Sequence, residues 1–524
     1  MLELAHGGAP ANRWRQTRRS VALGLPLLGL AATPLRSAFA AASETLTIGV
    51  HVSLAPSWFD PAETLGIITP YMVLYALHDA MIKPMPGNEF APSLAESWTL
   101  TPDKLAYEFV LRKGVHFHNG DLLTPGDVKF SFERYRGAGH ALMKERVARV
   151  DVLSADTIRF TLREPWPDFI TYYSSATGAG WIVPRKHVEK VGEADFRHAP
   201  IGAGPYKFVA FSPGVELVLE AFDRYWRKKP GIKRIVLKVI PDDTTRTIAL
   251  KQGEIDIAYS IRGELAEDVR RTPGLTLKPT VGSAPFWMYF TEQWDPQSPW
   301  HDVRVRLAAR YAIDYDTINK ALTLGYSHIT GSIMPENFEF YKAMAKPRHD
   351  LAKAKQLLAE AGYPTGFDAG FYFCDSSYAN LGETMINNLA EAGIRAKLRP
   401  LERAAFFQGY AQKKFKGIVQ GASGAFGNVA TRMEGFVVKG GAYVYGSYPE
   451  IDALFPEQSK EMDHAKRAAI LNKMQDLVDA KAMYAPIWQL AFISAVGPRV
   501  GESGIGLIGH FVYTAPYEDM TLKG

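Results

Sequence analysis

The sequence contains a single cysteine, Cys374, among its 524 residues. One thiol excludes an internal disulfide and a cysteine-based metal cluster. Because no cysteine stands near the N-terminus, we also expect no lipid anchor. Long apolar runs are missing too: beyond residue 40, no segment reaches the roughly eighteen consecutive apolar residues that a membrane-spanning helix needs.

An excess of one charge is also absent from most of the chain. The formal net charge is +5. Much of this excess lies in residues 1–40, which carry Arg13, Arg15, Arg18, Arg19 and Arg36 against Glu3. The remaining chain is close to neutral, so its charge gives no reason to expect a nucleic acid as partner.

Motifs of the common enzyme classes are missing as well. The HExxH zinc motif and the phosphate-binding P-loop do not occur. Residues 504–509 spell a dinucleotide-binding pattern, but too few residues follow for the helix and strand that such a site requires. His116 and His118 could share one side of a strand, yet no further ligand stands at a metal-binding spacing. We therefore expect no enzyme, no catalytic residue, no metal ion and no cofactor.

The N-terminal segment has the layout of a cleaved export signal. A basic start is followed by a short apolar run over residues 21–35 and by the small-x-small site Ala38-Phe39-Ala40. Arg18-Arg19 resembles a twin-arginine signal. The general secretory route stays open, because the pair after Ser20 is smaller than that signal usually has. Residues 1–40 are thus expected to be removed, and the mature chain to act in the periplasm.

The rest of the sequence has the composition of a globular protein, with 47% hydrophobic and 22% charged residues. Aromatic residues make up 12%, which suits a protein that holds ligands against flat rings. Strand and helix patterns alternate and predict an α/β fold with helix-covered sheets. The sharpest local predictions are hairpins at 96–111 and 206–220, a helix capped by Thr124, and a strand–helix–strand unit at 233–261.

Several stretches, spread over most of the chain, resemble one family, the peptide-type extracellular solute-binding proteins of ABC importers (family 5), which includes dipeptide-, oligopeptide- and nickel-binding proteins. The stretches are residues 90–98 (FAPSLAESW), 112–121 (RKGVHFHNGD), 125–133 (PGDVKFSFE), 202–208 (GAGPYKF), 240–246 (IPDDTTR) and 302–314 (DVRVRLAARYAID). Most of these residues are expected to be structural. Arg304 and Arg306, for example, should lie on a solvated helix face or in ion pairs.

The resemblance implies a two-lobed periplasmic-binding-protein fold of type II, in the large cluster with an extra subdomain. Lobe I would comprise residues 43–283 and 487–524, with the extra subdomain at 71–194, and lobe II would comprise residues 284–486. The chain crossings near 283–284 and 485–486 would form a hinge. The implied partners are a small solute, peptide-like or an organic acid, and an ABC permease and ATPase complex at the inner membrane. We expect a monomer.

Ligands of α/β lobes bind beyond strand ends, and this rule selects the candidate site residues. Each aromatic candidate has a core role as its alternative, because neighbouring residues of a strand face opposite sides of the sheet. The candidates are Trp58, Trp287, Tyr289, Asp375, Phe426, Asn428, Arg432 and Trp488.

One departure from the resemblance concerns the ligand. Peptide-binding members usually have a tryptophan and an aspartate in the segment that corresponds to residues 420–430, and the aspartate holds the peptide's α-amino group. This chain has neither residue there. Since the nearest charge after the loop is Arg432, we expect a ligand with an acidic or polar end and no free α-amine there. The alternative is that Asp375 or Glu434 takes the amine.

The predicted function is the solute-binding component of an ABC importer. A ligand-sensing module that is not coupled to transport stays open, because a sequence does not separate the two. A secreted hydrolase is the remote alternative, and the missing catalytic motifs argue against it.

Overall fold

A computed structural model describes residues 44–64, 68–137, 139–424, 426–509 and 511–523. The predicted export signal, residues 1–40, lies outside the described residues and stays a prediction. No helix among the described residues is long and apolar enough to cross a membrane.

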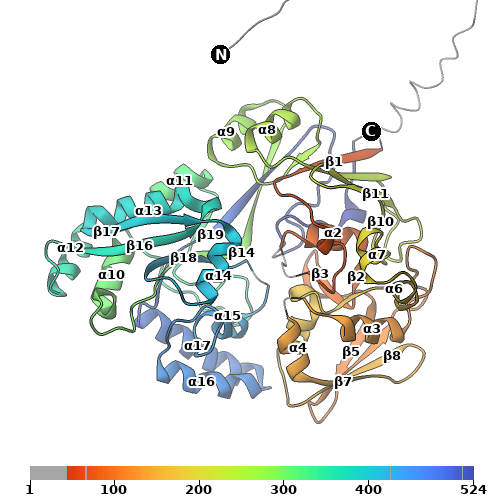
Figure 1. Cartoon of the computed structure of the whole chain (residues 1–524), viewed down its shortest axis with the longest axis horizontal. Coiled ribbons are helices and arrows are strands. Elements are labelled where there is room, and N and C mark those ends of the chain that lie inside the picture. The colour runs from red at the N-terminus through yellow and green to blue at the C-terminus, as the bar shows by residue number, and fades with distance from the viewer. Residues whose placement is uncertain (1–43, 65–67, 138, 425, 510, 524) are drawn as a thin grey trace, which may run out of the picture. The chain divides into compact units, whose positions relative to one another are not determined.

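One mixed sheet connects both lobes (Figure 1). Its strands, in spatial order, are β10 (Tyr206–Ser212), β11 (Glu216–Ala221), β12 (Arg234–Val239), β1 (Thr45–Val50), β13 (Ile257–Ala258), β19 (Tyr484–Val496), β14 (Thr276–Phe290), β18 (Gly417–Ala422), β16 (Phe367–Asp375) and β17 (Ile394–Leu401), with β15 (His328–Ile329) paired to β19. The predicted hairpin at 206–220 is confirmed, because β10 and β11 pair antiparallel.

In lobe I, β1 lies between β12 and β13 and runs parallel to both. The predicted strand–helix–strand unit is confirmed as β12, α8 (Asp243–Lys251) and β13, although β13 is shorter than the predicted strand. Helices α8 and α9 (Gly263–Arg271) pack on one face of this half-sheet. Helix α2 (Tyr71–Leu77) and the C-terminal segment pack on the other face.

In lobe II, β16 lies between β17 and β18 and runs parallel to both. Both faces of this half-sheet are buried. The covering helices are α10 (Val303–Tyr311), α11 (Tyr315–Thr323), α12 (Leu351–Glu360) and α13 (Ala379–Ala392) on one face, and α14 (Arg403–Ala411), α15 (Val429–Phe436), α16 (Pro449–Lys460) and α17 (His464–Ala480) on the other.

The extra subdomain has its own apolar core and its own antiparallel sheet. The hairpin predicted at 96–111 is confirmed as β5 and β6, and Thr124 and Asp127 form the predicted capping box at the start of α3. The elements of this region are β5 (Ala95–Leu100), β6 (Ala106–Leu111), β8 (Thr157–Leu162), β7 (Val147–Val152), α3 (Pro125–Arg134), α4 (His140–Arg146), α5 (Phe169–Thr171), α6 (Arg185–Val191), α7 (Glu193–His198) and the short pairs β2 (Asp79–Ala80) with β9 (Trp181–Ile182) and β3 (Ile82–Met85) with β4 (Asn88–Pro92).

A buried arginine in each lobe holds a loop by its backbone carbonyls. Arg246 donates to the carbonyl oxygens of Tyr259 (2.7 Å) and Ile240 (2.5 Å). Arg306 donates to those of Trp300 (2.5 Å) and Lys481 (2.7 Å) and is 2% exposed. The prediction of a solvated or ion-paired Arg306 is therefore wrong: the guanidinium satisfies backbone carbonyls, both of the preceding turn and of the distant Lys481.

The two long strands β14 and β19 carry the chain between the lobes. Their antiparallel pairing is regular up to Val281 and resumes at Pro285, which places an irregularity at the predicted crossing near 283–284. On β19, Ile487 and Trp488 pack in the core of lobe II, whereas Ile493 and Ala495 pack in lobe I. The hinge position stays a prediction, and this packing favours a second crossing after Trp488 rather than near 485–486.

His78 should make stability depend on pH. It is fully buried, its Nε2 lies 2.9 Å from the Phe59 carbonyl oxygen, and burial lowers its pKa to about 4. Between pH 6.5 and 4 the unfolded chain therefore binds a proton that the folded chain does not, so folding loses up to about 3 kcal/mol as the pH falls. We expect the unfolding free energy of H78Q to fall by about 3 kcal/mol less between pH 7 and 4 than that of wild type.

Urea titrations at several pH values measure this pH dependence of the unfolding free energy. The control is H349Q, which removes an exposed histidine. Identical pH profiles for wild type and H78Q would contradict a proton-free His78.

Candidate functional site

The C-terminal ends of parallel strands from both lobes meet at one place. His51 directly follows β1, and its ring centroid lies 4.5 Å from that of Tyr513. The pKa of His51 is lowered to about 4, mainly by burial and in addition by positive charges from lobe I (Arg246, Arg262) and from lobe II (Arg403). The buried Nδ1 of His51 has no hydrogen-bond partner among the described residues. Strand ends of both lobes thus surround an unsatisfied imidazole.

Two arginines at this place are each held by an aspartate of their own lobe. Arg262 Nε donates to Asp243 Oδ2 at 2.6 Å in lobe I. Arg403 Nη1 donates to Asp375 Oδ2 at 2.7 Å in lobe II. Asp375, a predicted ligand residue, ends β16, is 4% exposed and also accepts from the Ser377 N–H at 3.0 Å. The Asp375 carboxylate therefore already accepts hydrogen bonds from two residues of its own lobe.

The glycine-rich loop after β18 reaches the other lobe. Phe426 is 5% exposed, and its ring lies 6.0 Å from Phe90 and 6.1 Å from Phe511, both in lobe I. Gly421 is required by its neighbour, because a Cβ there would lie 2.3 Å from Trp287 Nε1. The structure therefore places Phe426 at the contact between the lobes.

A buried polar group joins the extra subdomain to lobe II. Asp168 accepts a hydrogen bond from Asn428 Nδ2 at 2.6 Å and another from Arg467 Nη2 at 2.5 Å. These three residues are at most 7% exposed. Asn428 also caps α15 by accepting from the Thr431 N–H at 3.1 Å. We name this group of three side chains the Asp168 contact. Asn428 thus has two roles: it binds Asp168 of the extra subdomain, and it caps a helix of lobe II.

A second, half-buried pair lies beside the Asp168 contact. Tyr172 donates its hydroxyl hydrogen to Glu434 Oε2 at 2.9 Å, and burial raises the pKa of Glu434. A more exposed pair, Lys460 with Glu164 at 3.3 Å, spans the same two parts. In the described conformation the lobes are thus closed along this edge.

Arg432 lies behind the glycine-rich loop. It donates to the Ser423 carbonyl oxygen from both terminal nitrogens, at 3.3 and 3.2 Å. Its guanidinium lies over the rings of Trp287 (5.8 Å) and Phe436 (5.3 Å), and burial lowers its pKa to about 9. No carboxylate of the described residues forms an ion pair with it. The residue holds the loop and carries a buried positive charge without an acidic partner.

Three of the predicted aromatic residues lie inside lobe II. Trp287 and Tyr289 are fully buried under the helices α14–α17, and Trp488 is 2% exposed on the opposite face of the sheet. Trp58 is partly buried against the core of lobe I. Trp287, Tyr289 and Trp488 therefore lie in the core, which was the alternative to a ligand-binding role for each aromatic candidate.

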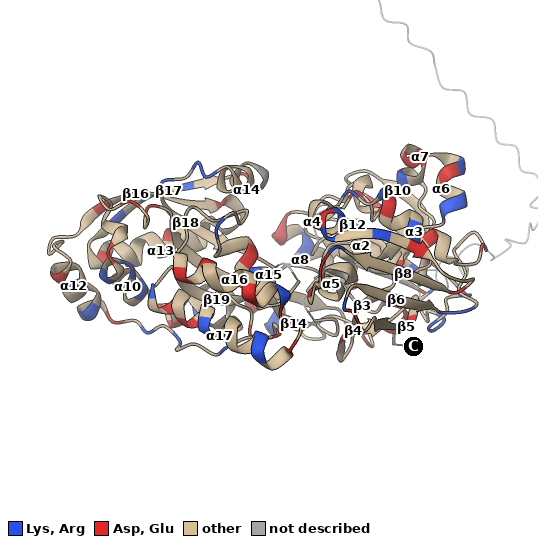
Figure 2. Ribbon diagram, turned by 90° about the horizontal axis from the view of Figure 1, so that it is seen from below, with Lys and Arg blue, Asp and Glu red and all other residues tan. Residues whose placement is uncertain are grey.

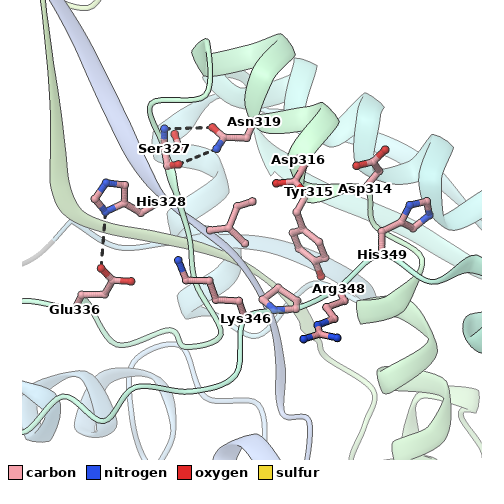
Figure 3. A pocket seen from close by; sticks show the side chains of 12 residues that line it. Asp314, Tyr315, Asp316, Asn319, Ser327, His328, Glu336, Lys346, Arg348 and His349 are labelled. Carbon is pink, nitrogen blue, oxygen red and sulfur yellow. Dashed lines mark hydrogen bonds and ion pairs between the residues drawn. The ribbon is translucent and has the colours of Figure 1, made fainter.

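A pocket of about 920 Å³ lies in lobe II between α11 and the segment before α12 (Figure 3). Its lining falls entirely between Asp314 and His349 and includes the exposed charges of Asp316, Glu336 and Arg348. None of the strand-end residues described above lines it. Among the described residues no group of histidine, cysteine and carboxylate side chains could hold a metal ion.

Several residues of this site were missed by the sequence analysis, namely His51, Arg262, Arg403, Asp168 and Arg467. The rule that ligands bind beyond strand ends could have found His51, since it directly follows β1. No local pattern indicates Asp168, because its partners lie 260 and 299 residues further along the chain.

Residues 89–443 match the family described as "Bacterial extracellular solute-binding proteins, family 5 Middle". The chain belongs to this family. It is therefore the solute-binding component of an ABC importer and acts in the periplasm. Basic and acidic residues are interspersed over both lobes in Figure 2.

Curated relatives and solved structures agree with this assignment. Heme-binding protein A of Haemophilus influenzae is 26% identical over 85% of this chain and 87% of its own. Glutathione-binding protein GsiB of Escherichia coli K12 is 24% identical over 90% of this chain and 94% of its own. These relatives are named as binding proteins and not as enzymes.

The fold prediction is confirmed by solved structures. The periplasmic binding protein DppA from Helicobacter pylori in complex with peptide STSA is 23% identical, with a TM-score of 0.75 over 92% of this chain and 98% of that one. The protein AgaA in complex with agropinic acid from A. tumefacien R10 is 25% identical, with a TM-score of 0.74 over 92% of this chain and 99% of that one.

Proposed function

We propose that this solute-binding protein works as a monomer that encloses one small organic solute between its lobes and presents the closed form to a membrane permease. The solute has an acidic or polar end toward the loop at residues 421–428 and no free α-amine there. The names of the relatives mention heme, glutathione, a peptide and agropinic acid. Because these compounds differ widely, the names do not indicate the solute of this protein, and the proposed solute class rests on its residues.

The observation that carries this proposal is the pairing of the carboxylates around the site. Asp375 binds Arg403, and Asp243 binds Arg262 and Arg246. Glu434 accepts from Tyr172, and Asp168 accepts from Arg467 and Asn428. A buried ammonium needs an acid, and each of these four acids already has a donor.

Arg432 adds the complementary argument. A buried guanidinium has five N–H donors, and its planar fork matches a carboxylate or another oxyanion. Here it donates only to the Ser423 carbonyl oxygen among the described residues. Its positive charge behind the loop favours an anionic or polar group and repels an amine.

A thermal-shift screen that compares free dipeptides with their N-acetylated forms tests the proposal. We expect N-acetylated dipeptides and other organic acids to raise the melting temperature more than free dipeptides do, since the four acids named above already accept hydrogen bonds from the protein. The screen includes the variants D375N and R432A. Stabilisation by free dipeptides alone, lost in D375N but kept in R432A, would refute the proposed solute class.

A further inference from the structure

One aromatic side chain of lobe II is buried by lobe I. Phe426 follows β18 in the chain of lobe II, yet it packs in the hydrophobic core cluster of lobe I. Its ring lies at an interplanar angle of 27° to that of Phe511, a stacked arrangement, and meets that of Phe90 edge to face at 69°. Aromatic pairs prefer both of these arrangements. The Phe426 ring is therefore covered by rings of the other lobe.

The surface of lobe I that receives Phe426 is built from aromatic rings. The Phe511 ring lies 4.9 Å from that of Tyr71 and 6.0 Å from that of Tyr75. Trp181 packs against both tyrosines, with ring centroids 5.6 and 5.2 Å away. We name these four residues and Phe90 the aromatic socket. All five belong to lobe I and four of them pack on one another, so lobe I presents the socket without help from lobe II.

The loop that carries Phe426 lies close to lobe I. On the side of lobe II, Arg432 holds this loop by donating two hydrogen bonds to the Ser423 carbonyl oxygen. At the next residue, a Cβ on Gly424 would lie 3.5 Å from Ile68 Cδ1 of lobe I, which is van der Waals contact. The small glycine therefore lets the backbone approach lobe I closely enough to insert the Phe426 ring into the socket.

Opening the lobes would separate the Phe426 ring from the aromatic socket and expose both to water. Burial of a phenylalanine side chain stabilises the buried state enough to shift an equilibrium roughly tenfold or more. This contribution involves neither a charge nor a solute. It therefore acts in the empty protein as well as in the loaded one.

We propose that the aromatic socket of lobe I binds the ring of Phe426 as a latch, which shifts the empty protein toward its closed form. The socket takes a flat apolar group of the size of benzene, and lobe II supplies that group from its own chain. A solute between the lobes finds this position already filled. The inference goes beyond the proposed solute class and rests on the proposed function only for the opening and closing of the lobes.

Lobe closure in the absence of solute, measured by fluorescence energy transfer, tests the latch. The dyes are attached at Lys186→Cys on α6 and Glu457→Cys on α16, since both residues are exposed and the native Cys374 is buried. Unfolding in guanidinium, dialysis and refolding remove any solute that co-purifies, so that the measured closure belongs to the empty protein.

The test variants are F426A and F426L, and the matched control is F371A. Phe371 is a phenylalanine of lobe II that is 40% exposed and does not belong to the aromatic socket. Each variant is measured in the otherwise native protein and in D168N. The second background removes the carboxylate of the Asp168 contact, so that closure depends more strongly on the latch.

We expect F426A to lower the closed-to-open ratio roughly tenfold or more, F426L to lower it less, and F371A to leave it unchanged. Benzene should then restore closure in F426A, because the closed variant contains a ring-sized apolar cavity of the kind that binds benzene. Benzene should have no effect on the closure of wild type, whose socket is already filled.

A closed-to-open ratio of F426A within about twofold of its parent in both backgrounds would overturn the latch. So would an F426A protein that benzene does not close again. The latch and the proposed solute class fail separately, because the same labelled proteins can be titrated with free and N-acetylated dipeptides. Closure by free dipeptides alone would refute the solute class and leave the closure of the empty protein, and with it the latch, unaffected.

Discussion

Replacing Asp168 by asparagine should open the molecule and weaken solute binding by roughly 30-fold or more. Asp168 accepts from Asn428 and Arg467 of lobe II, and all three are buried. Removing one partner of a buried charge pair costs about 2–5 kcal/mol, because the other charge stays buried and unpaired. If opening exposes Arg467 to water, the cost falls on the closed form alone.

Small-angle scattering and calorimetric titration of D168N with the best acid from the thermal-shift screen check this prediction. The control is E164Q, which breaks the exposed Lys460–Glu164 pair between the same two parts. An exposed pair contributes at most about 1 kcal/mol, so E164Q should change affinity by less than about fivefold. A radius of gyration and an affinity equal to wild type in D168N would show that the Asp168 contact does not hold the lobes closed.

Trp287→Ala should cost about 3–5 kcal/mol of stability. The indole is fully buried in lobe II, where its ring centroid lies 5.2 Å from that of Phe436 and 5.9 Å from that of Tyr484. Its loss leaves a cavity under the loop that carries Phe426. We expect the folded fraction of W287A to bind the solute with an affinity near that of wild type.

Chemical denaturation and titration of the same variant separate the two effects. Phe371→Ala is the control, since Phe371 is an aromatic residue of the same sheet that is 40% exposed and should cost much less. A W287A protein with wild-type stability and strongly reduced affinity would place the indole in the solute site and contradict its core position.

Local signals account for the elements that the sequence predicted well. The box of Thr124 and Asp127 forms within one helical turn, and the hairpin at 96–111 needs only neighbouring strands. Helix α8 lies inside the predicted strand–helix–strand unit, where a carboxylate starts it and Gly253 follows its end. Such features are decided by residues that are close in the sequence.

The site was harder to predict because its contacts join distant residues. Alternation along β14 indicated that Trp287 and Phe286 face opposite sides, but both sides of this sheet are covered by helices. Alternation alone therefore does not separate cleft from core. Arg306 and Asp168 were misjudged or missed for the same reason: their partners, such as the Lys481 carbonyl and Arg467, lie far along the chain.

Native mass spectrometry of the protein, purified gently from the periplasm, tests the central claim that it encloses an acidic solute. We predict a one-to-one complex that releases on denaturation a compound with a carboxylate or another oxyanion and no free α-amine. A released peptide with a free α-amine would contradict the account.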